Sequence, residues 1–170
     1  MTDHLRAGVL GVGSMGRHHA RVYAELPDVT LAGVADEDRE RATEVARAHG
    51  TRARSVEDLL DQVDVVSVAV PTVYHSRLAG RALERGVHVL VEKPFVETPA
   101  EGRRLIELAE DRGLVLQVGH VERFNPAVET LNDVLADYDL LGLSARRLGP
   151  PTDRTHGGVA LDLMIHDIDV

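Results

Sequence analysis

The stretch G-V-G-S-M-G, residues 11–16, lies between a short apolar segment and a segment with helical periodicity. In that setting Gly11 permits a tight turn, Gly13 lets the backbone approach a pyrophosphate, and Gly16 lets helix and strand pack closely. The start of the helix also offers amide donors and the positive end of its dipole to a phosphate. Because a turn that merely needs glycines would look the same, the surrounding sequence decides between the two.

Asp36 supplies that context, because it ends the next apolar segment, about 20 residues after Gly16. A carboxylate there can accept both ribose hydroxyls and would repel a 2′-phosphate, which favours NAD over NADP. Arg39 keeps NADP open, and a helix N-cap is the alternative role for Asp36. We predict a dinucleotide site that includes Gly11, Gly13, Ser14, Met15, Gly16 and Asp36.

Short valine-rich segments alternate with helical segments as far as residue 119, which is typical of βαβ units. Strands are predicted at 6–11, 29–35, 63–69, 87–91 and 114–119, with a weak one at 51–53. Helices are predicted at 14–25, 37–48, 55–60, 74–85 and 98–112. We therefore predict an α/β fold over residues 1–120, a Rossmann-type doubly wound parallel sheet.

Turn and capping residues mark the ends of these helices. Gly50, Gly86 and Gly113 each follow a predicted helix, where a left-handed C-cap is expected. Ser55 and Thr98 have the chemistry of N-caps. After residue 119 the alternation stops, and the sequence predicts a helix at 125–136, a strand at 140–148 and a last helix from 159 to 170.

Composition excludes several classes of protein. The chain has 170 residues, no cysteine and a net charge of −9, so disulfides, thiolate metal sites and binding to a nucleic-acid backbone are not expected. The N-terminus lacks a signal peptide, and no segment has the length of a membrane span. These features predict a soluble, cytoplasmic protein without a membrane partner.

Lys93, in the segment V-L-V-E-K-P-F, is the only lysine of the chain. A lysine ammonium can lose its proton, whereas arginine stays charged, so an isolated lysine is a candidate proton donor. The alternative is a leftover surface charge. A-V-P-T-V-Y-H, E-K-P and G-H-V-E-R-F-N-P all follow predicted strands, at the edge where parallel sheets bind ligands. This placement favours a functional Lys93, whose geometry Pro94 restricts.

Asp162 and His166 are four residues apart and would share one face of a helix. Histidine suits a general base, although a surface ion pair has the same spacing. His120, His75 and His156 could complete a metal site in principle, but no ligand motif supports one, so we predict no metal. His18 and His19 are expected to be structural or to lie near phosphate.

Several ordered motifs together resemble the Gfo/Idh/MocA family of oxidoreductases. They are G-V-G-S-M-G, A-V-P-T-V-Y-H, V-E-K-P-F, V-G-H-V-E-R-F-N-P-A and D-L-M-I-H-D-I-D, and they span essentially the whole chain. The resemblance implies a nicotinamide-dependent sugar oxidoreductase in which Lys93 contacts substrate and cofactor. It also implies that Asp162 and His166 supply the acid and base.

The later motifs look most like the nucleotide-sugar branch, such as UDP-N-acetylglucosamine 3-dehydrogenases. Thr72 and Met164 depart from the common family residues, asparagine and glycine, and Met164 bears on pocket shape. We expect further cofactor contacts from Pro71, Thr72, His75, Glu92 and Lys93. Substrate contacts are expected from His120, Arg123 and Asn125.

The expected function is therefore oxidation of a secondary hydroxyl of a nucleotide sugar by NAD. Residues 121–170 would begin an α+β domain that binds substrate and builds a homo-oligomer in the full-length enzyme. Because the resemblance implies a longer chain, a fragment and a truncated gene product are both open. The alternative function is a non-catalytic NAD-binding module that senses cofactor or pairs with another chain.

Overall fold

The computed structural model describes residues 4–135, 138, 139, 141, 142, 144, 146 and 164–169. The chain divides into two compact units, residues 1–119 and 120–170, and each is described by itself.

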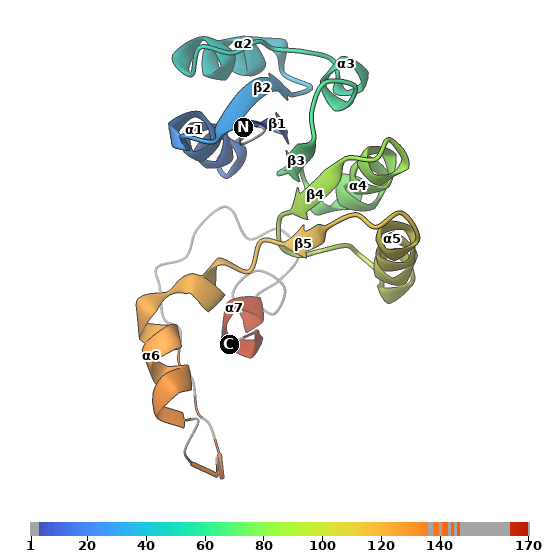
Figure 1. The fold of residues 1–170 in the computed structure, drawn as a ribbon. Coiled ribbons are helices and arrows are strands. Elements are labelled where there is room, and N and C mark those ends of the chain that lie inside the picture. The colour runs from blue at the N-terminus through green and yellow to red at the C-terminus, as the bar shows by residue number, and fades with distance from the viewer. Residues whose placement is uncertain are drawn as a thin grey trace. The chain divides into compact units, whose positions relative to one another are not determined.

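The first unit is built on a five-stranded sheet in which every pair of neighbouring strands is parallel (Figure 1). Its strands are β1 (Leu5–Leu10), β2 (Val29–Ala35), β3 (Val65–Val68), β4 (His88–Val91) and β5 (Leu116–Val118). The order β2-β1-β3-β4-β5 reverses direction at β1, so the carboxyl ends of β1 and β3 form the switch point where such sheets bind ligands. The predicted Rossmann-type fold is confirmed. The weak strand at 51–53 is only a single bridge between Val34 and Ala53.

Helices cover both faces of the sheet. They are α1 (Gly16–Glu25), α2 (Arg39–Ala48), α3 (Val56–Leu60), α4 (His75–Glu84) and α5 (Pro99–Asp111). In Figure 1, α1 lies to the left of the sheet, and α4 and α5 lie to its right. Two buried apolar clusters match this arrangement: one contains residues of α1 and α2, and the other residues of α3, α4 and α5. The predicted helices are confirmed, with ends that differ by one or two residues.

Local capping explains where the helices start and stop. Gly50, Gly86 and Gly113 all have positive φ, as predicted for left-handed C-caps. Ser55 accepts a hydrogen bond from the amide of Asp58, and Thr98 forms a capping box with Glu101.

The alternative role of Asp36 as the helix N-cap is wrong. Asp38 caps α2, because its side chain accepts from the amides of Glu40 and Arg41. Asp36 lies two residues before this cap and does not cap the helix.

The second unit contains the short helical turn η2 (Val121–Phe124), α6 (Pro126–Leu135) and α7 (Ile165–Ile168). Helix α6 confirms the helix predicted at 125–136. The strand predicted at 140–148 lies largely outside the described residues, as does most of the helix predicted from 159 to 170.

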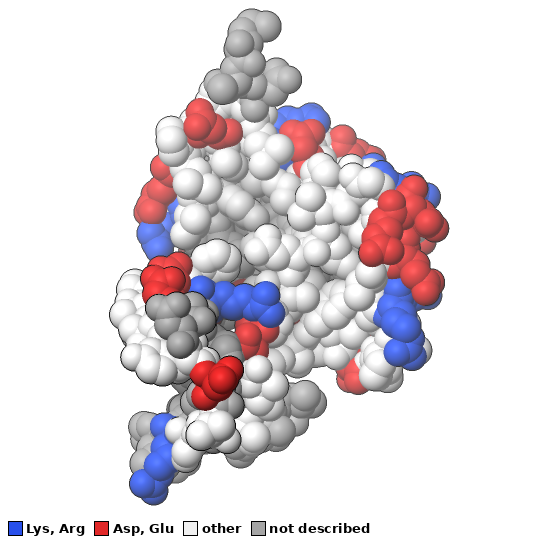
Figure 2. Space-filling view, turned by 60° about the horizontal axis from the view of Figure 1, so that its bottom comes forward, with Lys and Arg blue, Asp and Glu red and all other residues white. Residues whose placement is uncertain are grey.

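The surface carries charges of both signs. On the face shown in Figure 2, acidic and basic side chains lie beside one another in several places. Within the described residues, no helix is both long and apolar enough to cross a membrane.

Candidate active site

The glycine turn after β1 shows a different constraint at each glycine. Gly11 has a φ of 83°, and a Cβ there would lie 2.7 Å from the carbonyl oxygen of Ala69. A Cβ on Gly16 would lie 1.7 Å from the carbonyl oxygen of Gly11. A Cβ on Gly13 would meet no described atom within 4 Å. Gly11 and Gly16 are therefore required by the turn itself, whereas Gly13 leaves open the approach that a pyrophosphate needs. Ser14 and Met15 are exposed between them.

Asp36 directly follows β2, and only 4% of its side chain is exposed. One carboxylate oxygen accepts from the amide of Val12 at 2.7 Å, and the other from the amide of Asp38 at 2.9 Å. Burial acts to raise the pKa of Asp36, but hydrogen bonds from Arg41, Val12 and Asp38 outweigh it and lower the pKa. The group that would receive the ribose is therefore an ionised, oriented carboxylate.

Arg41 covers that carboxylate, although it was not among the predicted site residues. Its Nη2 and Nε donate to the two oxygens of Asp36 at 2.6 and 3.2 Å. Arg39, the residue expected to keep NADP open, instead lines a separate surface pocket along α2. The N-cap of α2 could have pointed to Arg41. With Asp38 as the cap, Arg41 belongs to the first turn of α2, where its side chain reaches Asp36.

Replacing Arg41 with glutamine is expected to raise the ratio of NADH affinity to NADPH affinity by about 10-fold. The ribose hydroxyls would no longer compete with the guanidinium for Asp36, and a 2′-phosphate would lose the cation beside that carboxylate. Fluorescence titration with both cofactors measures the ratio. Arg39→Gln is the matched control and should leave the ratio unchanged. An equal shift in both variants would contradict this assignment.

The other predicted residues of this unit follow β3 and β4, two strands that are neighbours in the sheet. Pro71 precedes the short turn η1 (Thr72–Tyr74), and Thr72 is the first residue of that turn. Glu92 follows β4 and is 7% exposed, and Lys93 is half-buried. The peptide bond between Lys93 and Pro94 is cis. The carboxyl ends of β1, β3 and β4 thus bring the glycine turn, Pro71 and Lys93 to one edge of the sheet.

His75 is buried, with 1% of its surface exposed. Its Nδ1 lies 3.0 Å from the carbonyl oxygen of Pro94, and its Nε2 lies 2.8 Å from that of Val70. The side chain links the segment after β3 to the turn after β4. Its expected contact with the cofactor stays a prediction.

Two of the residues predicted to bind substrate, His120 and Arg123, lie around Asp169 in the second unit. Arg123 donates to both carboxylate oxygens of Asp169, at 2.7 and 2.6 Å, and His120 Nδ1 lies 3.3 Å from the same group. The hydrogen bonds from Arg123 lower the pKa of Asp169, and the nearby His120 and His166 act in the same direction. Asp169 ends the motif D-L-M-I-H-D-I-D but was not among the predicted site residues.

The remaining predicted residues of this unit have different placements. Asn125 accepts from the amide of Ala127 at 3.0 Å, in the first turn of α6. His166 belongs to α7. Asp162 lies outside the described residues. Within the described part of the chain, no three His, Asp or Glu side chains come together as metal ligands.

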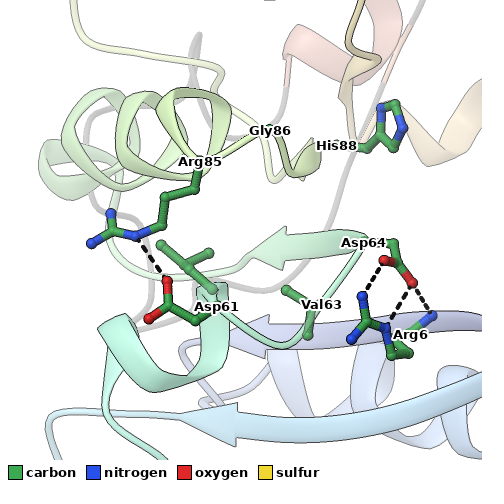
Figure 3. A pocket seen from close by; sticks show the side chains of 8 residues that line it. Arg6, Asp61, Val63, Asp64, Arg85, Gly86 and His88 are labelled. Carbon is green, nitrogen blue, oxygen red and sulfur yellow. Dashed lines mark hydrogen bonds and ion pairs between the residues drawn. The ribbon is translucent and has the colours of Figure 1, made fainter.

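A surface pocket of about 510 Å³ lies at the opposite edge of the sheet, near the amino ends of β1 and β4 (Figure 3). Arg6 and Asp64 form an ion pair at 2.6 Å across it, and Arg85 and Asp61 form another at 3.4 Å. Its polar lining is thus occupied by internal ion pairs, and it is separate from the glycine turn.

Residues 5–120 match the model of an oxidoreductase family with an NAD-binding Rossmann fold, GFO_IDH_MocA. The chain belongs to this family. It is 45% identical to a UDP-N-acetylglucosamine 3-dehydrogenase of Acidithiobacillus ferrooxidans over 169 residues, which cover 98% of this chain and 53% of the relative. A solved structure of that enzyme superposes with a TM-score of 0.87, at 44% identity, over 98% of this chain and 55% of the other.

Solved structures that resemble this chain include complexes with either nicotinamide cofactor. GenD2 from gentamicin A biosynthesis, in complex with NAD, matches with a TM-score of 0.87 at 32% identity, over 98% of this chain and 52% of the other. KijD10, a 3-ketoreductase from Actinomadura kijaniata in complex with NADP and TDP-benzene, matches with a TM-score of 0.73 at 28% identity. The match covers 78% of this chain and 42% of KijD10. The predicted family and its nicotinamide cofactor are confirmed. The chain spans about half the length of the curated relatives that it matches.

Proposed function

We propose that the protein oxidises a secondary hydroxyl of a nucleotide sugar with NAD, and that its substrate resembles UDP-N-acetylglucosamine oxidised at C3. The observation that carries this proposal is the 45% identity to a UDP-N-acetylglucosamine 3-dehydrogenase across nearly all of this chain. The ionised Asp36 beside an open Gly13 supports the choice of NAD, since the carboxylate matches a ribose diol and opposes a 2′-phosphate.

The chain's own residues have distinct tasks in this proposal. When bound, NAD accepts the hydride from the substrate carbon. Lys93 holds and polarises the reacting oxygen through its ammonium group. His166 takes the hydroxyl proton, and Asp162 orients the site. His120, Arg123 and Asn125 are proposed as substrate contacts. Residues 121–170 are proposed to begin the domain that binds substrate and forms a homo-oligomer.

The first test is cofactor choice: this chain is expected to bind NADH about 10-fold more tightly than NADPH. Titration by nucleotide fluorescence measures both affinities, and Asp36→Ala should abolish the difference because no carboxylate remains to receive the ribose. Equal affinities in the unmodified chain would contradict the role of Asp36.

The second measurement is turnover. The complete protein should produce NADH from NAD and UDP-N-acetylglucosamine. Tight NADH binding without turnover on any nucleotide sugar would instead identify a cofactor-binding module.

A further inference from the structure

A series of partly buried hydrogen bonds runs from α1 to the turn that carries Lys93. The hydroxyl of Tyr23 lies 2.8 Å from Ser67 Oγ, which lies 3.2 Å from His19 Nδ1. His19 Nε2 lies 2.8 Å from Glu92 Oε1, and the other oxygen of Glu92 accepts from the amide of Lys93 at 3.2 Å. These hydrogen bonds thus link α1, β3 and the residues that follow β4. The predicted mechanism gives His19 no task.

Because Glu92 is buried, its ionised state depends on the hydrogen bond from His19. Glu92 is 7% exposed, and a Cβ on Gly119 would lie 3.2 Å from its carboxyl carbon, so protein atoms enclose the group. Burial acts to raise the pKa of Glu92, but the hydrogen bond from His19 leads the effects that outweigh it, and the pKa is lowered. An enclosed carboxylate needs hydrogen-bond donors to stay ionised.

Each side chain in this hydrogen-bond series has a partner when all the hydrogen bonds are donated in one direction. Tyr23 donates to Ser67, Ser67 donates to His19 Nδ1, and His19 Nε2–H donates to Glu92. Burial raises the pKa of Tyr23, which keeps its hydroxyl available as the first donor. This order fixes the tautomer of His19 and aims its Nε2 proton at the carboxylate.

Another histidine, the buried His75, holds the other side of the same turn. His75 Nδ1 lies 3.0 Å from the carbonyl oxygen of Pro94 and 3.2 Å from that of Phe95. The residue before Lys93 is therefore held from α1, and the two residues after it are held from α4. A lysine has a long, flexible side chain, so the direction of its ammonium group depends on how firmly its backbone is fixed.

We propose that His19 is a positioning residue: by holding the ionised Glu92, it fixes the backbone from which Lys93 extends. His75 restrains the same turn at Pro94 and Phe95. The link to catalysis rests on the proposed function, in which Lys93 polarises the reacting oxygen. The link to the position of Lys93 does not rest on it.

The single lysine makes this proposal directly measurable. Reductive methylation with ¹³C-formaldehyde labels Lys93 and the N-terminal amine, and Lys93→Arg assigns the two NMR signals by removing one of them. Methylation preserves the charge of the amine. The signal of Lys93 then reports its surroundings in the 170-residue chain without any assay of turnover.

Two substitutions of His19 separate its two hydrogen bonds. The amide nitrogen of glutamine falls near the place of Nε2, so His19→Gln retains a donor to Glu92. Asparagine reaches only the place of Nδ1, so His19→Asn retains a partner for Ser67 and releases Glu92. Both variants lose the imidazole ring. We expect the Lys93 signal to shift and broaden in His19→Asn and to stay close to that of the unmodified chain in His19→Gln.

Identical Lys93 signals in all three proteins would overturn the proposal. Equal changes in both variants would also overturn it, because they would come from loss of the imidazole ring and not from loss of the donor to Glu92. Thermal unfolding of each variant checks that the fold is kept. If His19→Asn does not fold, Glu92→Gln replaces it, since the amide keeps the size of the side chain and removes its charge. An unshifted Lys93 signal in that variant would overturn the proposal equally.

Adding NADH separates this inference from the proposed function. A Lys93 signal that responds to His19→Asn but ignores NADH would support the positioning role and contradict the place of Lys93 beside the cofactor. In the complete enzyme, His19→Asn should lower kcat by on the order of 10²-fold and change the KM for NAD little. His19→Gln should recover most of that loss, which a role in packing alone would not predict.

Discussion

Replacing Lys93 with arginine is expected to lower kcat of the complete enzyme by on the order of 10² to 10³ while NADH affinity changes little. The ammonium of lysine is a compact point charge that can be directed at one oxygen, whereas the guanidinium is planar, larger and always protonated. Lys93 is half-buried in a turn held on both sides, so the larger head group has little freedom to adapt. Steady-state kinetics with NAD and the nucleotide sugar, beside an NADH titration, measure the two effects separately.

Arg103→Lys provides the control for this exchange, because it makes the reverse substitution at an exposed position of α5. It should leave both kcat and NADH affinity unchanged. Full turnover by Lys93→Arg would show that Lys93 is a surface charge without a catalytic task.

Alanine at Gly16 and at Gly13 is expected to have opposite consequences, although the two residues share one turn. At Gly16 the new Cβ would lie 1.7 Å from the carbonyl oxygen of Gly11, so α1 and the turn must separate. We expect the free energy of unfolding to fall by roughly 3 kcal/mol. At Gly13 the Cβ would meet no described atom within 4 Å, and the change should stay within about 0.5 kcal/mol.

Cofactor binding should separate the two variants further. Gly13→Ala should bind NADH at least about 10-fold more weakly, because its methyl group occupies the approach that a pyrophosphate needs. Urea unfolding and NADH titration on the same samples give both quantities. A Gly13→Ala variant that binds NADH normally would show that the pyrophosphate does not pass over this residue, and a fully stable Gly16→Ala would contradict the close contact with Gly11.

The helices and strands of the first unit were predictable because their signals are local. Valine-rich segments, helical periodicity and capping residues such as Thr98 act within a few positions of one another. The N-cap of α2 shows where such signals fail. Asp36 and Asp38 are equally good caps by type, and the choice depends on the amide of Val12, which lies on another segment and engages Asp36.

The candidate site was predictable only in part for the same reason. Motifs placed Gly13, Asp36 and Lys93 at one edge of the sheet, because strand ends can be recognised in the sequence. The contact of His19 with Glu92 joins residues 73 positions apart, and that of Arg123 with Asp169 joins residues 46 apart. Pairings across such separations are set by tertiary packing, which no local pattern records.

The order of strands also has a consequence for how the chain is made. Strand β3 pairs with β1, β4 pairs with β3, and β5 pairs with β4, so beyond the first pair the sheet grows in the order of synthesis. Each strand that leaves the ribosome after β2 therefore finds its partner already present, and no pairing waits for a segment that is still to be translated. From β3 onward the growing edge of the sheet is the strand made last, while β2 remains the opposite edge throughout.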